Sequence, residues 1–521
     1  MTARQQREVW ATKVGLVLAL AGNAVGLGNL LRFPRQVAEN GGGAFMVPYF
    51  ISLILMGIPL MWVELAMGRR GGVYGYGTTP GMFGLLWRHP AARYVGALGI
   101  LITSALVIYY TYIVSWCMGY AFFSAAGTYF GETSQTAMGS FFDGYLGVEK
   151  NQYFSGIGAA YFFFVATLLL VVWILSRGVV KGLETLARIA MPVLFVLGVA
   201  LVARVLTLEP NPANPGWNVG AGLGFIWNPD LSRLGDGKVW LAAAGQIFFT
   251  LSLGFGAIQT YASYIREKQD LALTGLAAAS VNEGVEVIIG GTLAIPAAVV
   301  FFGPMQTQAI ASGGSFSLGF LSLPVVFQQM PFGQFFGSMW FLLLFLAGVT
   351  SSVAMAQPAM AFLQEDFRLT RPRAALVVGA VMLVLIQPVI FFQRYGFLDE
   401  MDYWVGTFGL VVMALIEVIL FAWVFGMDRA WGEITRGAEL AIPRVFYYVI
   451  KYVTPLFLVV ILVVWTWQEA IGMLLMRGVV PEAVPYRWGA RLLILGLFAA
   501  ILFGVHKRWG GKPMDEMEHP S

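Results

Sequence analysis

The sequence predicts an all-α polytopic membrane protein that crosses the bilayer twelve times. Of its 521 residues, 58% are hydrophobic and only 12% are charged, whereas a typical soluble domain is about 25% charged. Twelve apolar runs are long enough to cross a bilayer, and the first and the sixth are interrupted midway by glycine and polar residues. These interruptions predict discontinuous helices that head two five-helix repeats of opposite orientation.

The twelve apolar runs are separated by short loops that carry most of the basic residues. They lie near residues 14–34, 44–67, 94–123, 156–176, 180–206, 239–263, 271–302, 335–363, 374–393, 403–425, 446–470 and 488–506. When the twelve spans are counted along the chain, the basic residues fall in the loops on one side of the membrane. The positive-inside rule assigns that side to the cytoplasm. We therefore expect a multi-pass protein of the cell inner (plasma) membrane with both termini in the cytoplasm.

The same runs divide the chain into successive parts. We expect a cytoplasmic N-terminal segment (1–10), a first five-helix repeat (11–206), an extracellular connection (207–236), a second five-helix repeat (237–425), helices eleven and twelve (443–506) and a cytoplasmic C-terminal tail (507–521). The last two helices lie outside the repeat.

The first interruption is the stretch Gly22-Asn23-Ala24-Val25-Gly26-Leu27-Gly28-Asn29. An unpaired backbone group costs several kcal/mol in hydrocarbon, so a helix that opens here must line a cavity within the protein. The amides and carbonyls of an opened turn can hold an ion. The alternative is that Gly22-x-x-x-Gly26 lets two helices pack closely. A second glycine-broken stretch, from Phe248 to Gly256 in the sixth run, favours the opened turn.

Several long motifs follow one another in a specific order. They are Trp10-Ala11-Thr12, the stretch from Gly22 to Asn29 followed by Leu31-Arg32-Phe33-Pro34, Glu39-Asn40-Gly41-Gly42-Gly43-Ala44-Phe45, the stretch from Gly245 to Gly256, and Thr350-Ser351-Ser352. With these motifs the chain resembles the neurotransmitter:sodium symporter family, and among its members it is most similar to the bacterial leucine transporter. The resemblance implies the leucine-transporter-type fold, with a 5+5 inverted repeat, discontinuous helices 1 and 6 and two extra helices.

The resemblance also implies two sodium ions bound by neutral oxygens, which suit a hard cation. Sodium site 1 would consist of the Ala24 carbonyl and the side chains of Asn29, Thr250 and Asn282, completed by the substrate carboxylate. Sodium site 2 would consist of the carbonyls of Gly22, Val25 and Ala347 and the hydroxyls of Thr350 and Ser351. The alternative for these two hydroxyls is a hydrogen bond back to the preceding helical turn.

A substrate site is implied between the two broken helices. Amides near Leu27 and Gly28 and the hydroxyl of Tyr110 would hold a carboxylate, while helix carbonyls and Ser351 would hold an amine. Gly26 stands where amine transporters of the family carry an acid, which favours amino acids. The expected substrate-binding residues are Ala24, Gly26, Leu27, Gly28, Leu106, Tyr110, Phe249, Thr250, Ser252, Phe255, Ser351 and Met355. Their mostly apolar side-chain pocket suits neutral, mainly hydrophobic substrates.

Charged residues match the family's two gates. Arg32 and Asp402 would form the extracellular gate. Arg7 and Glu365 would form the cytoplasmic gate with Trp10, Ser263 and Tyr264, and Asp366 is the alternative to Glu365.

Two acidic residues, Glu286 and Glu64, lie inside predicted spans, where a carboxylate is costly enough to indicate a function. Glu286 lies one helical turn after Asn282, so both face the expected ion region. Chloride-dependent relatives carry a small hydroxyl residue at the position of Glu286. The resemblance therefore implies a chloride-independent protein, with proton involvement at Glu286 as a hypothesis.

These observations predict a sodium-coupled secondary active symporter of neutral amino acids that works by alternating access. The expected partners are the amino-acid substrate and the lipid bilayer; a homodimer stays open, and the scattered basic residues exclude a nucleic-acid patch. A transport-inactive, sodium-dependent amino-acid sensor is the alternative. A channel is disfavoured because bulky aromatic residues would close over the site. An enzyme is excluded because the sequence has no HExxH, GxSxG or P-loop motif.

Overall fold

The computed structural model describes residues 8–314 and 316–510, and its regular structure is helical. In this part of the chain, ten helices are long and apolar enough to cross a membrane, and the bent pair α1 and α2 makes an eleventh. The sixth predicted span is present as two shorter helices, α11 and α12, on either side of residues 251–256. The structure therefore shows eleven of the twelve predicted spans by length and composition, and α11 and α12 lie at the place of the sixth.

The first five spans run from α1 to α9. Their elements are α1 (Lys13–Ala24), η1 (Gly28–Arg32) and α2 (Phe33–Glu39); α3 (Gly43–Ser52), η2 (Leu53–Gly57) and α4 (Ile58–Val73); α6 (Ala91–Ala126); α8 (Gly158–Ser176); and η3 (Val179–Glu184) with α9 (Thr185–Leu206). Shorter helices in the connections are α5 (Thr79–Leu86), α7 (Gln135–Tyr145), α10 (Val219–Trp227) and η4 (Leu231–Gly235).

The next five spans run from α11 to η9. Their elements are α11 (Gly237–Thr250) and α12 (Ala257–Ala262); α13 (Leu271–Glu283), η5 (Gly284–Gly290) and α14 (Gly291–Ser312); α16 (Gly333–Asp366); α17 (Arg371–Leu385), α18 (Gln387–Phe392) and η7 (Gln393–Tyr395); and α19 (Phe397–Met401), η8 (Asp402–Phe408), α20 (Gly409–Val418) and η9 (Ile419–Val424). Between the spans lie η6 (Ser317–Ser322) and α15 (Leu323–Gln328).

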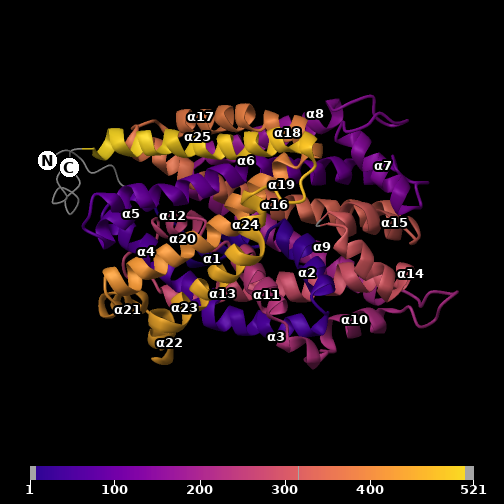
Figure 1. Cartoon of the computed structure of the whole chain (residues 1–521), viewed down its shortest axis with the longest axis horizontal. Helices are drawn as coiled ribbons and strands as arrows, with labels where there is room; N and C mark the ends of the chain where they lie inside the picture. The colour runs from indigo at the N-terminus through magenta and orange to yellow at the C-terminus, as the bar shows by residue number, and fades with distance from the viewer. Residues whose placement is uncertain (1–7, 315, 511–521) are drawn as a thin grey trace.

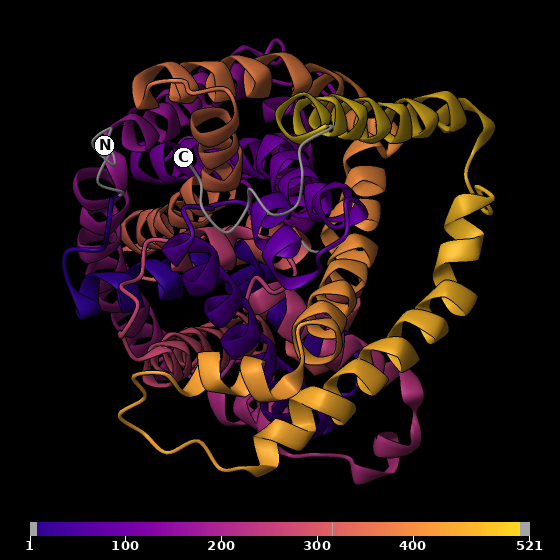
Figure 2. The ribbon, with the colours of Figure 1, turned by 90° about the vertical axis from the view of Figure 1, so that its left-hand side faces the viewer.

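The last two spans lie on the outside of the bundle (Figure 2). A surface helix, α21 (Met427–Thr435), precedes them. Span eleven comprises α22 (Val445–Tyr448), η10 (Val449–Val453), α23 (Thr454–Trp465), η11 (Thr466–Ala470) and α24 (Ile471–Leu474), and span twelve comprises η12 (Pro481–Ala483) and α25 (Val484–Trp509). Their position agrees with the prediction that both are additions to a ten-helix repeat.

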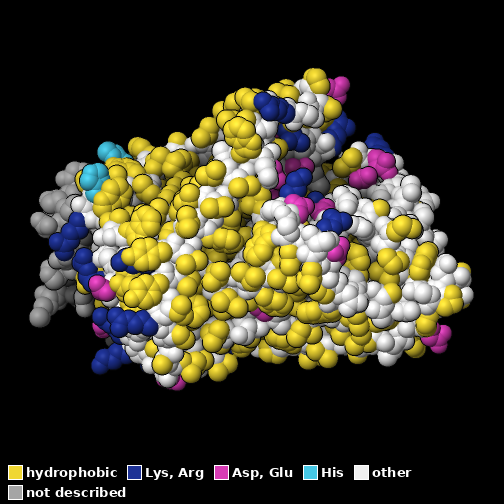
Figure 3. Space-filling model, turned by 60° about the horizontal axis from the view of Figure 1, so that its bottom comes forward, with side chains coloured by type: hydrophobic (Ala, Val, Ile, Leu, Met, Phe, Trp, Pro, Cys, Tyr) yellow, Lys and Arg dark blue, Asp and Glu magenta, His cyan; other side chains and the backbone are white. Residues whose placement is uncertain are grey.

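The spans run along the long axis of the molecule (Figure 1). We call its two ends the Trp10 end, where α25 finishes, and the Arg32 end, which carries α7, α10 and α15. Hydrophobic side chains cover much of the face seen in Figure 3; Lys and Arg side chains lie at its left end and also, beside Asp and Glu side chains, in its upper right part. Large apolar side chains such as Phe162, Val196 and Leu456 are more than 60% exposed, as lipid-facing residues would be.

The first span breaks where glycine and asparagine replace the regular helix. Helix α1 ends at Ala24, the backbone of Val25 is extended, and the chain resumes at Gly28 after a bend of 49°. The side-chain Oδ1 of Asn29 accepts a hydrogen bond of 2.8 Å from the amide of Gly26. This bond supplies a partner for an amide that the opened turn has freed.

The sixth span breaks over residues 251–256, where the backbone three times takes a left-handed conformation. Ser252, Gly254 and Gly256 have φ values of 55°, 72° and 80°. A Cβ added to Gly254 would lie 2.4 Å from the carbonyl oxygen of Leu410, so both the conformation and the close packing require glycine. The amide of Gly254 donates a 2.7 Å hydrogen bond to Oε1 of Glu64, which satisfies it within the membrane.

Candidate functional site

A cavity of about 1350 Å³ extends from the broken helices to the Arg32 end. Its inner part is lined by most of the predicted substrate residues: Ala24, Gly26, Leu27, Gly28, Leu106, Tyr110, Phe249, Ser252, Phe255, Ser351 and Met355. Thr250, which was also expected there, does not line the cavity and belongs to a polar cluster behind it. The cavity exceeds the usual 300 to 1,000 Å³ of a small-molecule pocket because it includes a wide mouth with Lys238 and Trp467.

The polar part of the cavity is formed by the opened turn of the first span. The amide of Leu27 donates a 3.0 Å hydrogen bond to the hydroxyl oxygen of Tyr110. A Cβ added to Gly26 would lie 2.7 Å from that hydroxyl oxygen and 3.0 Å from Oγ of Ser351. Glycine at position 26 therefore leaves the space between the Tyr110 and Ser351 hydroxyls free of side chain.

The residues of the first predicted sodium site lie in contact. The side-chain Nδ2 of Asn29 lies 2.9 Å from Oγ1 of Thr250, 2.9 Å from Oδ1 of Asn282 and 2.8 Å from Oε2 of Glu286. Three acceptor oxygens thus face an amide group that has two protons. Side-chain oxygens of this kind are the ligands that a hard cation prefers, and Ala24, the remaining predicted member, lines the cavity beside them.

The predicted intramembrane carboxylate Glu286 joins this cluster to α3 and α11. Its Oε1 accepts hydrogen bonds of 2.9 Å from both Tyr49 and Gln246, and its Oε2 accepts from Asn29 and the hydroxyl of Thr250. These four donors occupy the lone pairs of a fully buried carboxylate.

A further acid, Glu283, which was not predicted from the sequence, lies beside this carboxylate. The hydroxyl of Tyr49 also lies 2.6 Å from Oε2 of Glu283. Its position next to Asn282 in the sequence could have indicated that Glu283 lies near the expected ion region. Tyr49 therefore links two carboxylates with a single hydroxyl proton.

The oxygens of the second predicted sodium site surround Ser351. Its Oγ lies 3.3 Å from the carbonyl oxygen of Gly22, 3.2 Å from that of Val25 and 3.2 Å from that of Ala347. The Thr350 hydroxyl lies 2.9 Å from the same Ala347 oxygen. Thr350 therefore forms the hydrogen bond to the preceding turn of its own helix that was the alternative to sodium binding. Ser351 also contacts carbonyl groups of the first span. The Oγ of Ser351 also lies 3.2 Å from the carbonyl oxygen of Asn23. One hydroxyl proton cannot satisfy four carbonyl groups, so this arrangement suits a cation.

Asn23 is a second residue that the sequence analysis did not single out. It lines the cavity, its side chain is 2% exposed, and neither amide atom has a partner among the described residues. Buried amides are normally hydrogen-bonded. Its position inside the first glycine-broken stretch was the signal in the sequence.

At the Arg32 end, the two predicted gate residues lie apart. Asp402 accepts a 2.6 Å hydrogen bond from the hydroxyl of Tyr109, and the guanidinium of Arg32 lies 4.5 Å from the ring centroid of Phe249. No ion pair joins Arg32 to Asp402 among the residues that the structure describes. Both line the cavity, so its mouth is open between them.

At the Trp10 end, the first span is tied to α12 and the segment that follows it. The indole Nε1 of Trp10 donates a 2.9 Å hydrogen bond to the carbonyl of Tyr261, and its amide donates one of 3.3 Å to the carbonyl of Tyr264. The Tyr264 hydroxyl lies 2.8 Å from Nε2 of Gln357 on α16. The hydroxyl of Ser263 donates to the carbonyl of Thr260 in its own helix. These contacts close this end.

The acidic gate residues have other contacts at this end. Arg7 lies outside the described residues, so its pairing with Glu365 or Asp366 stays a prediction. Oε2 of Glu365 accepts a 2.9 Å hydrogen bond from the amide of Gly77, and Oδ1 of Asp366 lies 3.8 Å from Arg508. A further ion pair of 3.0 Å, which sequence reasoning missed, joins Arg371 to Glu8.

Glu64, the other predicted intramembrane carboxylate, stabilises the break in the sixth span. Besides its bond from Gly254, it lies beside a second buried acid, Glu417 of α20, which accepts a 2.5 Å hydrogen bond from Gln259. Glu417 is a charged residue within an apolar run, which was the signal for it in the sequence.

Comparison with known sequences shows the family to which this chain is similar. The sequence model described as the sodium:neurotransmitter symporter family matches residues 7–131 and 125–477. The chain is 32% identical to an uncharacterized sodium-dependent transporter of Methanocaldococcus jannaschii, over 87% of this chain and 89% of that protein. It is 27% identical to a sodium- and chloride-dependent taurine transporter of Canis lupus familiaris, over 82% of this chain and 73% of the relative.

A solved structure supports the same assignment. The crystal structure of MhsT in complex with L-phenylalanine aligns with a TM-score of 0.74 at 28% sequence identity, over 88% of this chain and 99% of that chain. The alignment confirms the predicted leucine-transporter-type fold. The prediction that the chain is not an enzyme agrees with the family that its sequence matches and with a relative described as a sodium-dependent transporter. The chain belongs to the sodium:neurotransmitter symporter family and is a sodium-dependent membrane transporter.

Proposed function

We propose that this chain is a symporter that couples the entry of two sodium ions to that of one neutral, mainly hydrophobic amino acid, without chloride. The observation that carries this proposal is the composition of the cavity. Its polar part presents the Leu27 amide and the hydroxyls of Tyr110 and Ser351. Its remaining inner wall includes the apolar side chains of Leu106 and Met355. A zwitterionic backbone fits the first part and an apolar side chain fits the second.

The substrate class is supported from two directions. No acidic side chain stands at Gly26 to hold a lone amine, which favours a substrate that brings its own carboxylate. The solved relative MhsT was crystallised with L-phenylalanine, and the rings of Phe249 and Phe255, with centroids 6.5 Å apart, lie in the cavity of this chain. Aromatic side chains of substrates can pack against such rings.

The two sodium sites follow the oxygen clusters. Site 1 comprises Asn29, Thr250, Asn282 and the Ala24 carbonyl, and we propose that the substrate carboxylate completes it from the cavity. Site 2 comprises the carbonyls of Gly22, Val25 and Ala347 with the hydroxyls of Thr350 and Ser351. An ion at site 2 would hold α1 against α16 and favour the state that is closed at the Trp10 end. Its release would free the first span to move, as alternating access requires.

We further propose that the Trp10 end faces the cytoplasm of a cell whose inner membrane holds the protein. The basic loops of this end support that orientation, so the cavity at the Arg32 end opens outward. The division into repeats at 11–206 and 237–425, the homodimer and the gate roles of Arg7, Glu365 and Asp366 remain predictions.

The decisive experiment is uptake into proteoliposomes. We expect L-phenylalanine and aliphatic amino acids to accumulate above equilibrium under an inward sodium gradient, with no uptake under choline or potassium gradients or in empty liposomes. Replacing chloride by gluconate should leave uptake unchanged. Sodium-dependent binding without accumulation would instead support the sensor, and loss of uptake in gluconate would contradict chloride independence.

The open space at Gly26 gives a sharper test of the substrate site. In Gly26→Ala the new methyl group would crowd Tyr110 and Ser351, so equilibrium binding of radiolabelled L-phenylalanine should weaken at least tenfold, a loss of about 1.4 kcal/mol. Gly284→Ala is the matched control because a Cβ there meets no atom within 4 Å. Equal binding by Gly26→Ala and wild type would place the substrate elsewhere.

A further inference from the structure

Three arginines converge on a small pocket at the Trp10 end, away from the transport cavity. The pocket has a volume of about 240 Å³ and is lined by Arg70, Tyr74, Leu85, Leu86, Arg88, Val424, Phe425 and Arg429. These residues come from the end of α4, from the end of α5 and the turn after it, and from the junction between η9 and α21. Among the residues that the structure describes, the lining contains no acidic residue. We call it the arginine pocket.

Aromatic rings hold two of the three guanidinium groups in place. Arg70 lies 4.6 Å from the ring centroid of Phe425 and 5.3 Å from that of Tyr74, and Arg429 lies 5.1 Å from the Phe425 centroid. Arginine stacks on aromatic faces and keeps its in-plane N–H groups available for oxygen ligands. The Phe425 ring thus positions two guanidinium groups beside one space.

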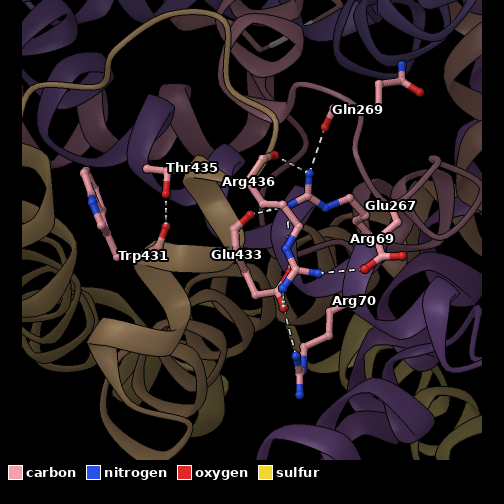
Figure 4. A network of polar contacts seen from close by, with 8 residues as sticks. All are labelled: Arg69, Arg70, Glu267, Gln269, Trp431, Glu433, Thr435 and Arg436. Carbon is pink, nitrogen blue, oxygen red and sulfur yellow. Dashed lines mark hydrogen bonds and ion pairs between the residues drawn. The ribbon is translucent and has the colours of Figure 1, made fainter.

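The wall that carries Arg70 is anchored by the polar network of Figure 4. Arg70 donates a 2.9 Å hydrogen bond to Oε1 of Glu433 in α21. The neighbouring Arg69, which is 1% exposed, donates to the backbone carbonyls of Glu433, Arg436 and Gln269. These bonds fix α21 and the segment after it against the end of α4, so the arginine pocket is formed before any ligand arrives.

Within residues 8–314 and 316–510, Glu433 is the acid that pairs with Arg70 of this pocket, and Arg429 is not paired with it. Glu433 is shared among three arginines, at 2.9 Å from Arg70, 3.5 Å from Arg436 and 3.8 Å from Arg69. Arg429 forms no ion pair with any residue in 8–314 or 316–510. The arginine pocket therefore offers more charge than its own acid neutralises, which is the condition for binding an anion.

Apolar surface continues from the pocket to the outside of the bundle. Val424 lines the pocket and is 43% exposed, and the adjacent Trp423 is 52% exposed with its Nε1 bonded to the carbonyl of Lys451 at 2.8 Å. A half-exposed tryptophan at the end of a span marks the level of the lipid headgroups. Basic pockets between spans at this level bind acidic headgroups.

We propose that the arginine pocket binds the phosphate group of an anionic phospholipid, with the acyl chains lying along Trp423 and Val424. Arg429 contacts the phosphate oxygens through its N–H groups, and Arg88 and Arg70, which line the same pocket, contribute charge. Arginine pairs with phosphate in a two-pronged geometry that a single ammonium cannot reproduce. A lipid headgroup and free phosphate would present the same phosphate oxygens to these arginines. Because apolar surface adjoins the pocket, we assign the phosphate to a lipid rather than to free phosphate.

Native mass spectrometry of the delipidated full-length protein tests this proposal. With dioleoyl-phosphatidylglycerol added, we expect one retained lipid molecule, and none with dioleoyl-phosphatidylcholine at the same concentration. Inorganic phosphate in large excess should displace less than a tenth of the bound phosphatidylglycerol. If phosphate displaces it fully, or binds while the lipid does not, the lipid assignment is overturned.

Point variants locate the site. Arg429→Gln and Arg88→Gln should each lower the occupancy of phosphatidylglycerol at least fivefold. Arg266→Gln removes the same charge from an exposed loop position at the same end that does not line the pocket, and it should bind like wild type. Arg429→Lys keeps the charge without the planar group and should give an intermediate occupancy. Full retention in both Arg429→Gln and Arg88→Gln would overturn the location; if one variant does not fold, the other decides.

Discussion

Replacing Glu286 with serine is expected to make transport depend on chloride. The carboxylate lies 2.8 Å from Asn29 and bonds to Thr250, so it supplies a fixed negative charge beside the proposed sodium site 1. Two unit charges about 5 Å apart interact by roughly 3 kcal/mol at an effective dielectric constant of 20, which corresponds to about a hundredfold in binding. In gluconate buffer, sodium-driven uptake by Glu286→Ser should therefore fall at least tenfold below wild type.

Added chloride should restore uptake in Glu286→Ser, because the shorter side chain leaves room for an anion among the donors that Glu286 now occupies. The informative control is Glu283→Gln, which removes the adjacent carboxylate that also contacts Tyr49 and should keep chloride-independent uptake. Uptake by Glu286→Ser that is as fast in gluconate as in chloride would show that the fixed charge is not needed for sodium binding.

Thr250→Val is expected to raise the sodium concentration needed for half-maximal substrate binding by ten- to a hundredfold. Valine keeps the shape of threonine and removes the oxygen that Asn29 and Asn282 contact, each at 2.9 Å. A hydrogen bond or dipole contact to a charged group contributes about 1.5–3 kcal/mol, and each 1.4 kcal/mol is a factor of ten. Sodium titration of radiolabelled amino-acid binding to the purified protein measures this shift.

Thr103→Val provides the matched comparison for this experiment. Thr103 is also buried, but its hydroxyl bonds only to the carbonyls of Gly99 and Ile100 in its own helix, at 2.9 and 3.2 Å. Its sodium dependence should equal that of wild type. A sodium curve for Thr250→Val that overlays the wild-type curve would remove Thr250 from sodium site 1 and leave its hydroxyl a structural role.

The backbone part of the candidate site was predictable because it lies at two short stretches whose glycines break a helix. Asn29 contacts Thr250 and Asn282, and Ser351 approaches Gly22, so the structure brings these residues together, while their binding of sodium stays a prediction. Residues of one motif stay together because a helix break exposes only the few backbone groups within a turn or two.

Contacts between distant side chains could not be predicted in the same way. Asp402 bonds to Tyr109 rather than to Arg32, and Tyr49 bridges Glu283 and Glu286 from another span. Such pairings depend on the packing angle and the conformational state of whole helices, which hydropathy does not encode.

The sequence by itself determined that the chain crosses the membrane many times, where its first and sixth helices break, and which oxygens are available near the breaks. These properties depend on local composition, because a charge or an unpaired backbone group in hydrocarbon costs free energy wherever it occurs along the chain. Only the tertiary structure decided that the cavity opens at the Arg32 end, that Glu64 stabilises the break at Gly254, and that Arg70, Arg88 and Arg429 meet in one pocket. These features join segments far apart in the sequence, and long-range packing alone sets their distances.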